Sequence, residues 1–205
     1  MTATRPRPRG WQPLPVGNDS TGTRGWPTNF RTCARLVKSQ VELDFPRLVG
    51  ALHRHRVAYV LIGGLAAVFH GSPFPTEDAD ITPAADPENL VRLAAALNEL
   101  GARVRTESVA EGLPFACDAE TLAGAQTWNL VTDAGDLDIA FQPSGTGGYP
   151  DLRRDSTEAE LYDVTVRIAS LGDVIRSKQA ANRPKDQRVL PALRAILSRR
   201  DQSGS

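Results

Sequence analysis

Long apolar runs, cysteine and net charge are all scarce in this chain of 205 residues. No apolar run approaches the roughly 20 residues needed to cross a bilayer, so we expect no membrane span and a cytoplasmic location. The two cysteines, Cys33 and Cys117, form neither a disulfide framework nor a paired metal-ligand motif. The chain therefore has the length and composition of one ordinary globular domain with a tail.

The formal charge of zero conceals an uneven distribution of charge along the chain. Residues 1–40 carry a net charge of +6, residues 41–166 a net charge of −12 and residues 167–205 a net charge of +6. An acidic centre suits a cation site, and a basic C-terminal part suits a polyphosphate or a nucleic acid. Ordinary solvated surfaces would give the same blocks of charge, so this pattern alone decides nothing.

The first 40 residues differ in composition from the rest. They are rich in Pro, Gly, Arg, Thr and Ser, and their apolar residues follow no period of two or 3.6. We expect residues 1–40 to be a disordered basic extension. Residues 41–200 then form the folded domain, with a small helical part at about 170–200.

Hydrophobic periodicity predicts a mixed α/β fold for the folded part. The segments predicted as strands are residues 57–62, 78–82, 128–132, 137–141 and 164–168. The segments predicted as helices are residues 43–52, 65–70, 86–100, 170–181 and a final basic amphipathic helix. Residues 133–136 have the composition of a turn, so the two strands beside them are predicted to form an antiparallel hairpin.

Two aspartates on the second predicted strand point to a cation site. Asp78 and Asp80 are two residues apart, so their side chains share one face of the strand. Mg²⁺ prefers oxygen ligands and is usually held by one or two carboxylates together with substrate phosphates. Asp138, on a predicted neighbouring strand, could add a third carboxylate to this face. An isolated Asp-x-Asp is more often a turn or a solvated strand edge, and other features must support the metal site.

A glycine pair supplies that support. Gly63 and Gly64 follow the first predicted strand and precede a predicted helix. Glycines let a backbone approach phosphate closely, and the amides at the start of a helix carry partial positive charge. Alone, the pair would be consistent with a simple tight turn. Together with the aspartates, it predicts a phosphate site beside a cation site.

A longer set of residues keeps a fixed order along the chain. It comprises Gly63-Gly64-Leu65-Ala66, His70-Gly71, Thr76, Asp78, Asp80 and Asp138, followed by Ile168-Ala169-Ser170-Leu171, Lys178, Arg183, Lys185 and Asp186. This pattern, which covers about residues 45–195, resembles the signature of the AbiEii-type nucleotidyltransferases, including the MenT group of toxins. The resemblance implies a DNA polymerase β-like core, with a mixed twisted sheet flanked by helices.

The same resemblance implies a metal centre and a nucleotide site. Asp78 and Asp80 would bind two Mg²⁺ ions, with Mn²⁺ as an alternative, and Asp138 would complete the first metal site or take the proton of the acceptor hydroxyl. The residues assigned to the nucleoside triphosphate (NTP) and the substrate groove are Gly63, Gly64, Thr76, Lys178, Arg183, Lys185 and Asp186. Phe74 stands where relatives often carry arginine, which removes one phosphate contact.

The resemblance also implies a function. We expect the toxin of a toxin–antitoxin pair, which transfers a nucleotide, such as the pyrimidine nucleotide CMP, from NTP to the 3′ end of tRNA and blocks translation. Its partners would be NTP, tRNA and a cognate antitoxin protein. Two alternatives stay open: a nucleotidyltransferase that modifies a small molecule such as an antibiotic, or a protein, and a non-catalytic domain that only binds a partner.

Overall fold

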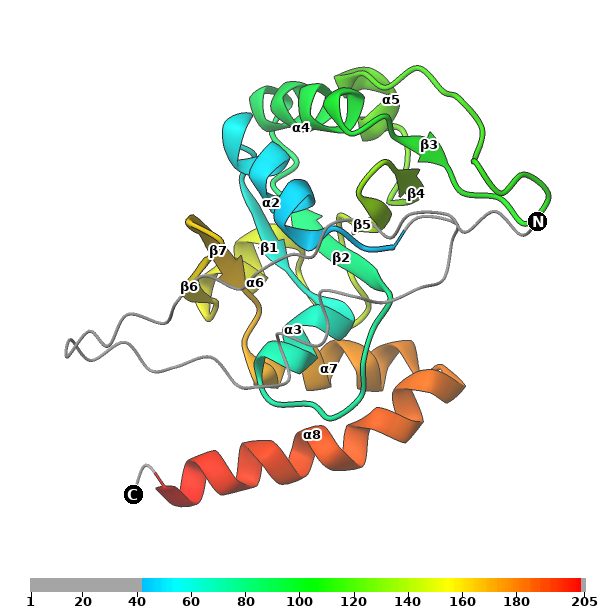
Figure 1. Cartoon of the computed structure of the whole chain (residues 1–205). Coiled ribbons are helices and arrows are strands. Elements are labelled where there is room, and N and C mark those ends of the chain that lie inside the picture. The colour runs from blue at the N-terminus through cyan, green and yellow to red at the C-terminus, as the bar shows by residue number, and fades with distance from the viewer. Residues whose placement is uncertain (1–41, 204–205) are drawn as a thin grey trace, which may run out of the picture.

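The computed structural model describes residues 42–203 (Figure 1). The expected disorder of residues 1–40 lies outside these described residues, and so does Cys33. Within the described part, seven strands form one mixed sheet with helices on either side of it. The mixed α/β fold predicted from the sequence is confirmed.

The strands follow one another across the sheet in an order that differs from their order in the chain. Their bounds are β1 Tyr59–Leu61, β2 Asp78–Pro83, β3 Arg103–Val104, β4 Thr127–Thr132, β5 Gly135–Ala140, β6 Thr157–Leu161 and β7 Val164–Ile168. The sheet order is β3-β4-β5-β2-β1-β7-β6. Strand β2 lies between β1, to which it is antiparallel, and β5, to which it is parallel. The central strands are therefore those predicted to carry the aspartates.

Apart from α6, which lies beside the strands, the helices form two groups with the strands between them (Figure 1). Their bounds are α2 Phe45–Arg54, α3 Gly63–Phe69, α4 Pro87–Glu99, α5 Ala119–Ala123, α6 Tyr149–Arg154, α7 Leu171–Ala181 and α8 Pro184–Ser203. Figure 1 shows α2, α4 and α5 at the top of the view and α3, α7 and α8 at the bottom. The helical C-terminal part expected from the sequence is thus α7 and α8, which pack against each other.

Local sequence explains where the helices near the site begin. Ser170 caps α7, because its hydroxyl oxygen accepts a hydrogen bond from the backbone N–H of Asp173. Asp86 caps α4 in the same way by accepting from the N–H of Asn89, and Pro87 occupies the first helical position. Helix α7 ends at Asn182, whose left-handed conformation suits asparagine.

The alternation along β2 and β5 separates the core from the site. Ala79 and Ile81 of β2 are buried in the core, as are Leu137 and Ile139 of β5. Because side chains alternate along a strand, the aspartates between these residues point to the opposite face of the sheet. The apolar face fixes the register, since a slip by one residue would bury the acids.

Four short elements were not predicted from the sequence. They are β3, α5, α6 and β6. Strand β6 is an edge strand with mostly exposed polar side chains, and the two short helices have one buried apolar side chain each, so none shows a clear hydrophobic period. No helix within residues 42–203 is long and apolar enough to span a membrane.

Candidate active site

Four aspartates share one face of the two central strands. Asp78 and Asp80 lie on β2, and in the parallel register they face Asp136 and Asp138 of β5, respectively. The pairing expected of Asp138 with the β2 aspartates is therefore present. Asp136 was missed, although Asp136-Leu137-Asp138 repeats the spacing of Asp78-Ala79-Asp80 and could have indicated it.

The glycine pair makes room for site side chains. Gly63 has a φ of +63°, and a Cβ at this residue would lie 2.0 Å from Oδ2 of Asp80. A Cβ at Gly64 would lie 2.4 Å from the Thr76 hydroxyl oxygen. The sequence placed the two glycines between a strand and a helix starting at 65, but both belong to the first turn of α3. They are needed because Asp80 and Thr76 pack directly on the backbone there.

Hydrogen bonds orient the two β2 carboxylates. The backbone N–H of Gly64 donates to Oδ2 of Asp80 at 3.3 Å. The Thr76 hydroxyl donates to Oδ1 of Asp78 at 2.7 Å. Each of these aspartates thus has a donor from the segment that the sequence analysis assigned to phosphate. Gly64 and Thr76 therefore position the acids, in addition to any contact with a nucleotide.

The carboxylates repel one another in the absence of a cation. Burial, followed by the negative charges of Asp78 and Asp138, raises the pKa of Asp80 to about 7. Burial also raises the pKa of Asp138, although the neighbouring Arg105 opposes this. A bound cation would relieve the repulsion, and carboxylate oxygens are the ligands that Mg²⁺ prefers. Asp78 and Asp80 therefore fit the divalent cation that the sequence predicted.

Arg105 compensates the two aspartates of β5. Its guanidinium donates to Asp136 at 2.9 Å and to Asp138 at 2.6 Å. Within residues 42–203 no three Asp, Glu, His or Cys side chains converge closely enough to hold an ion by themselves. One Asp138 oxygen is bound to Arg105, and of the two roles expected for Asp138, completing the first metal site or taking the acceptor proton, both stay predictions. Two carboxylates with substrate phosphates and water remain a suitable Mg²⁺ ligand set.

A buried ion-pair cluster holds the basic residues of the site. Asp186 is fully buried and accepts from Lys178 at 3.1 Å and from Arg183 at 2.7 Å. These ion pairs lower the pKa of Asp186, although burial opposes them. Asp186 thus positions the two cations from within the fold and lines neither hollow beside the aspartates.

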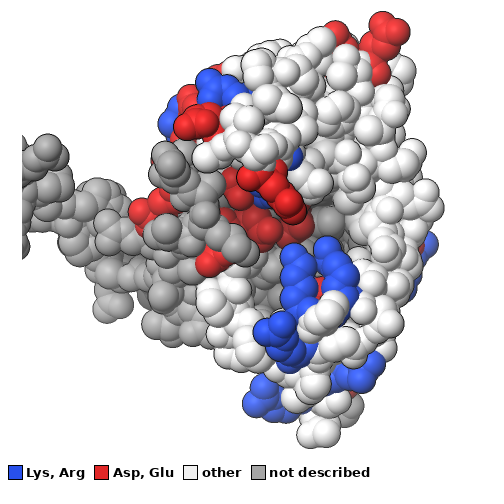
Figure 2. All heavy atoms as spheres, turned by 90° about the vertical axis from the view of Figure 1, so that its right-hand side faces the viewer, with Lys and Arg blue, Asp and Glu red and all other residues white. Residues whose placement is uncertain are grey.

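Two hollows meet at the carboxylates, and they differ in the residues that line them. The smaller, of about 160 Å³, has Lys178, Arg183 and Lys185 among its lining residues, together with both glycines, Phe74 and Thr76. The larger, of about 330 Å³, shares Asp80, Lys178 and Arg183 with the first and extends past Asp138. Figure 2 shows acidic side chains gathered in a hollow with a group of Lys and Arg side chains directly below them. Both hollows thus contain Lys178 and Arg183, Lys185 lines only the smaller one, and uncharged polar and apolar side chains make up most of the lining of the larger one.

The fold has a counterpart among solved structures. A crystal structure of the lincosamide antibiotic adenylyltransferase LnuA with lincomycin bound is 16% identical, with a TM-score of 0.50, and the match covers 76% of this chain and 99% of that chain. The fold is that of a nucleotidyltransferase. A solution structure of the antibiotic-resistance factor ANT(2″)-Ia is 17% identical with a TM-score of 0.44, over 77% of this chain and 90% of that chain.

The comparisons with sequences give no match. No protein-family model matches this chain, and no curated protein matches it. At 16% identity the likeness to LnuA concerns the fold. The narrower resemblance to AbiEii-type enzymes therefore stays a prediction.

Replacement of Arg105 by glutamine should make the stability of the protein depend on divalent cations. The variant leaves Asp136 and Asp138 without their counter-charge, so we expect it to lose about 1–3 kcal/mol in metal-free buffer. Mg²⁺ should restore more stability to the variant than to the wild type. Thermal unfolding with EDTA and with Mg²⁺ measures both effects. Arg103→Gln is the matched control, because Arg103 is exposed on β3, and equal behaviour of the two variants would refute the role of Arg105.

Replacement of Asp80 by asparagine should stabilise the metal-free protein at neutral and higher pH. The folded-state pKa of Asp80 is about 7, against an ordinary value of 3.8. The folded state therefore holds this proton more tightly than the unfolded state, and the wild type loses stability as pH rises between these values. The advantage of Asp80→Asn should grow from about pH 4 to pH 7 and then level off. Melting temperatures in EDTA across this range test it, and an advantage that is constant with pH would contradict it.

Proposed function

We propose that this chain transfers a nucleotidyl group from an NTP to an acceptor hydroxyl and releases pyrophosphate. One observation carries the proposal: Asp78, Asp80 and Asp138 lie on adjacent parallel strands at the junction of two hollows, which share Lys178 and Arg183, while Lys185 lines only the smaller one. In-line transfer needs phosphate-binding cations on one side of the reacting phosphorus and the acceptor on the other. The two hollows match this requirement.

Asp78 and Asp80 are the residues that we assign to the divalent cations. When bound, two Mg²⁺ ions would activate the attacking oxygen and neutralise charge on the leaving pyrophosphate. The Thr76 hydroxyl and the Gly64 N–H fix the orientation of these carboxylates. Mn²⁺ has the same preference for oxygen ligands and could replace Mg²⁺.

The smaller hollow is the side that we assign to the triphosphate. Lys178 and Arg183 are held by the buried Asp186, so their charges are positioned before the nucleotide arrives. Lys185 lines the same hollow. Phe74 lies 43% exposed among these residues and contributes no charge. Phosphate contacts would therefore come from α7 and α8, and not from the loop that contains Phe74.

Asp138 is the residue that we assign to the acceptor hydroxyl. One of its carboxylate oxygens is bound to Arg105, and the residue lines the larger hollow. Arg105 opposes the rise in the pKa of Asp138 that burial causes, and so favours the ionised state, which can accept a proton. Asp138 would take the proton of the hydroxyl that attacks the α-phosphorus.

The 3′ end of tRNA is the acceptor that the sequence resemblance favours. The basic residues of α8 add support, because a polynucleotide needs cations beyond those that bind the triphosphate. In this proposal the chain is a toxin that blocks translation, and a cognate antitoxin protein opposes it. A small hydroxyl-bearing molecule is the second candidate, supported by the amide and hydroxyl groups that line the larger hollow and by the shared fold of a lincosamide adenylyltransferase.

A single-turnover assay tests the reaction and its dependence on Asp138. CTP or ATP labelled at the α-phosphate is incubated with Mg²⁺ and either total tRNA or lincomycin. Label should pass to one acceptor, and Asp138→Asn should slow the transfer about 10³-fold because it removes the proton acceptor. Asp133→Asn is the matched control, since Asp133 is exposed in the turn between β4 and β5.

The outcome also separates the two acceptors. Binding to tRNA should weaken steeply as salt rises, whereas binding of a small neutral acceptor should change little. Label that stays entirely in the nucleotide pool with every acceptor, in the wild type as in Asp138→Asn, would count against the proposed function and favour a non-catalytic domain.

A further inference from the structure

The segment of residues 142–148 forms one wall of the larger hollow. It follows β5, which carries Asp138, and leads into α6. Gln142, Pro143, Ser144 and Thr146 line the hollow, and Gln142, Gly147 and Gly148 line a separate hollow. We call residues 142–148 the wall loop. Its position determines the width of the space beside Asp138.

The wall loop is held against α7 at its tip. Gly145 has a φ of +72°, and a Cβ at this residue would lie 2.7 Å from the Cβ of Ala180 and 3.2 Å from the carbonyl oxygen of Arg176. Its backbone therefore touches α7 directly. Within the loop, Thr146 donates both its hydroxyl, at 2.8 Å, and its N–H, at 3.1 Å, to the carbonyl of Pro143.

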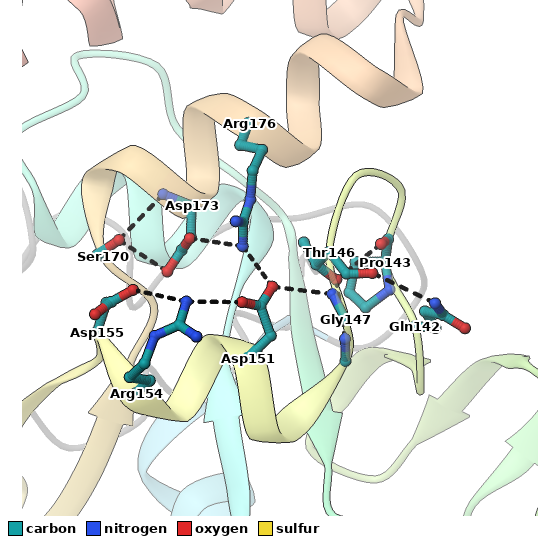
Figure 3. Close-up of polar contacts among 11 residues, drawn as sticks. Gln142, Pro143, Thr146, Gly147, Asp151, Arg154, Asp155, Ser170, Asp173 and Arg176 are labelled. Atoms are coloured by element: carbon teal, nitrogen blue, oxygen red, sulfur yellow. Dashed lines mark hydrogen bonds and ion pairs between the residues drawn. The ribbon is translucent and has the colours of Figure 1, made fainter.

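A network of ion pairs holds the other end of the wall loop (Figure 3). Asp151 of α6 accepts the N–H of Gly147 at 2.9 Å and also binds Arg176 of α7 at 2.5 Å. These interactions lower the pKa of Asp151, with the Gly147 hydrogen bond as the largest cause. Figure 3 shows Arg176 descending from α7 to Asp151, with Gly147 on the other side of that carboxylate. Asp151 thus joins the wall loop to α7.

Arg176 is fixed on α7 by a second carboxylate. It binds Asp173 at 2.8 Å, and Asp173 in turn accepts the hydroxyl of Ser170, the cap of the helix. Arg176 lies two positions before Lys178, which lines both hollows beside the aspartates. The network therefore ties the wall loop to the helix that carries Lys178, and its member Asp173 lines the larger hollow.

The larger hollow has one further charged lining residue apart from those at the reacting centre, Asp173, which is paired with Arg176. Asn129, Gln142, Ser144, Thr146 and Ser177 offer amide and hydroxyl groups. Lys178 and Arg183 are the only cations among its described lining residues, and both are shared with the triphosphate side. A phosphate deep in this space would find no further cation, whereas a sugar ring would find donors and acceptors for its hydroxyls.

We propose that Asp151 and Arg176 are positioning residues that hold the wall loop as the specificity-determining side of an acceptor space for an uncharged, hydroxyl-bearing ring. The proposal rests on the proposed function, since it takes the space beside Asp138 as the acceptor side. Such a ring could be the terminal ribose of an RNA or the sugar of a small glycoside, because both present hydroxyls without charge.

Arg176→Gln tests the proposal, because it should change the KM of the acceptor and not that of the NTP. Pyrophosphate release is followed with CTP or ATP, with total tRNA or lincomycin as acceptor probes, in the wild type, Arg176→Gln and Arg176→Lys. In Arg176→Gln the KM of the acceptor should rise about tenfold or more, because the wall loop is no longer held in place, while the KM of the NTP stays within about twofold. Arg176→Lys, which keeps the charge, should recover part of the loss. The probe that reacts identifies the source of the ring.

Arg167→Gln serves as the control. Arg167 pairs with Glu158 between β6 and β7, away from the wall loop, so this variant should resemble the wild type. Equal rises in the KM of NTP and acceptor, or an unchanged acceptor KM, would overturn the proposal. If the wild type uses neither probe, the missing reaction counts against the proposed function. Amide hydrogen exchange then tests separately whether Arg176 holds the wall loop. Faster exchange at Gly145–Gly148 in Arg176→Gln supports this role, and unchanged exchange overturns it.

Discussion

The structure depends on the close approach of four carboxylates on one face of β2 and β5. Like charges at this spacing repel, and burial increases the free-energy cost of ionising them. The fold accepts this arrangement because the opposite face of the same strands is the apolar core, which fixes the register. Each acid is then compensated locally: Asp136 and Asp138 by Arg105, Asp80 by a backbone amide and Asp78 by a hydroxyl.

The negative charges of the two strands are compensated unevenly, so the β2 aspartates are the ones that favour a cation. Arg105 supplies a full positive charge to β5, whereas the β2 aspartates receive only neutral donors and retain a need for cations. Lys178 and Arg183 stand nearby but are engaged by the buried Asp186, so they are positioned for anions without neutralising the β2 pair. In the proposed function, a divalent cation carried with phosphates would satisfy both groups of residues at once. The same charges that destabilise the metal-free site would then favour binding of a metal-bound nucleotide.

Sequence reasoning predicted the parts of the site that lie close together in the chain. Asp78 and Asp80 share a strand, so their common face follows from alternation alone, and the hairpin containing Asp138 is confirmed. Arg105 and the charge balance around Asp136 could not be predicted in this way, because they depend on how β3, β4 and β5 align and on a loop without periodicity. The wall loop was missed for the same reason. Short elements at the sheet edge have too few buried side chains to leave a hydrophobic pattern.

Anomalous diffraction tests the central claim most directly. Crystals grown with Mn²⁺ and a CTP or ATP analogue that cannot be cleaved between the α- and β-phosphates would locate the ions without relying on turnover. The account predicts Mn²⁺ bound by Asp78 and Asp80, with the phosphates of the analogue extending toward Lys178 and Arg183. Mn²⁺ absent from these carboxylates, with the analogue bound elsewhere on the protein, would contradict it.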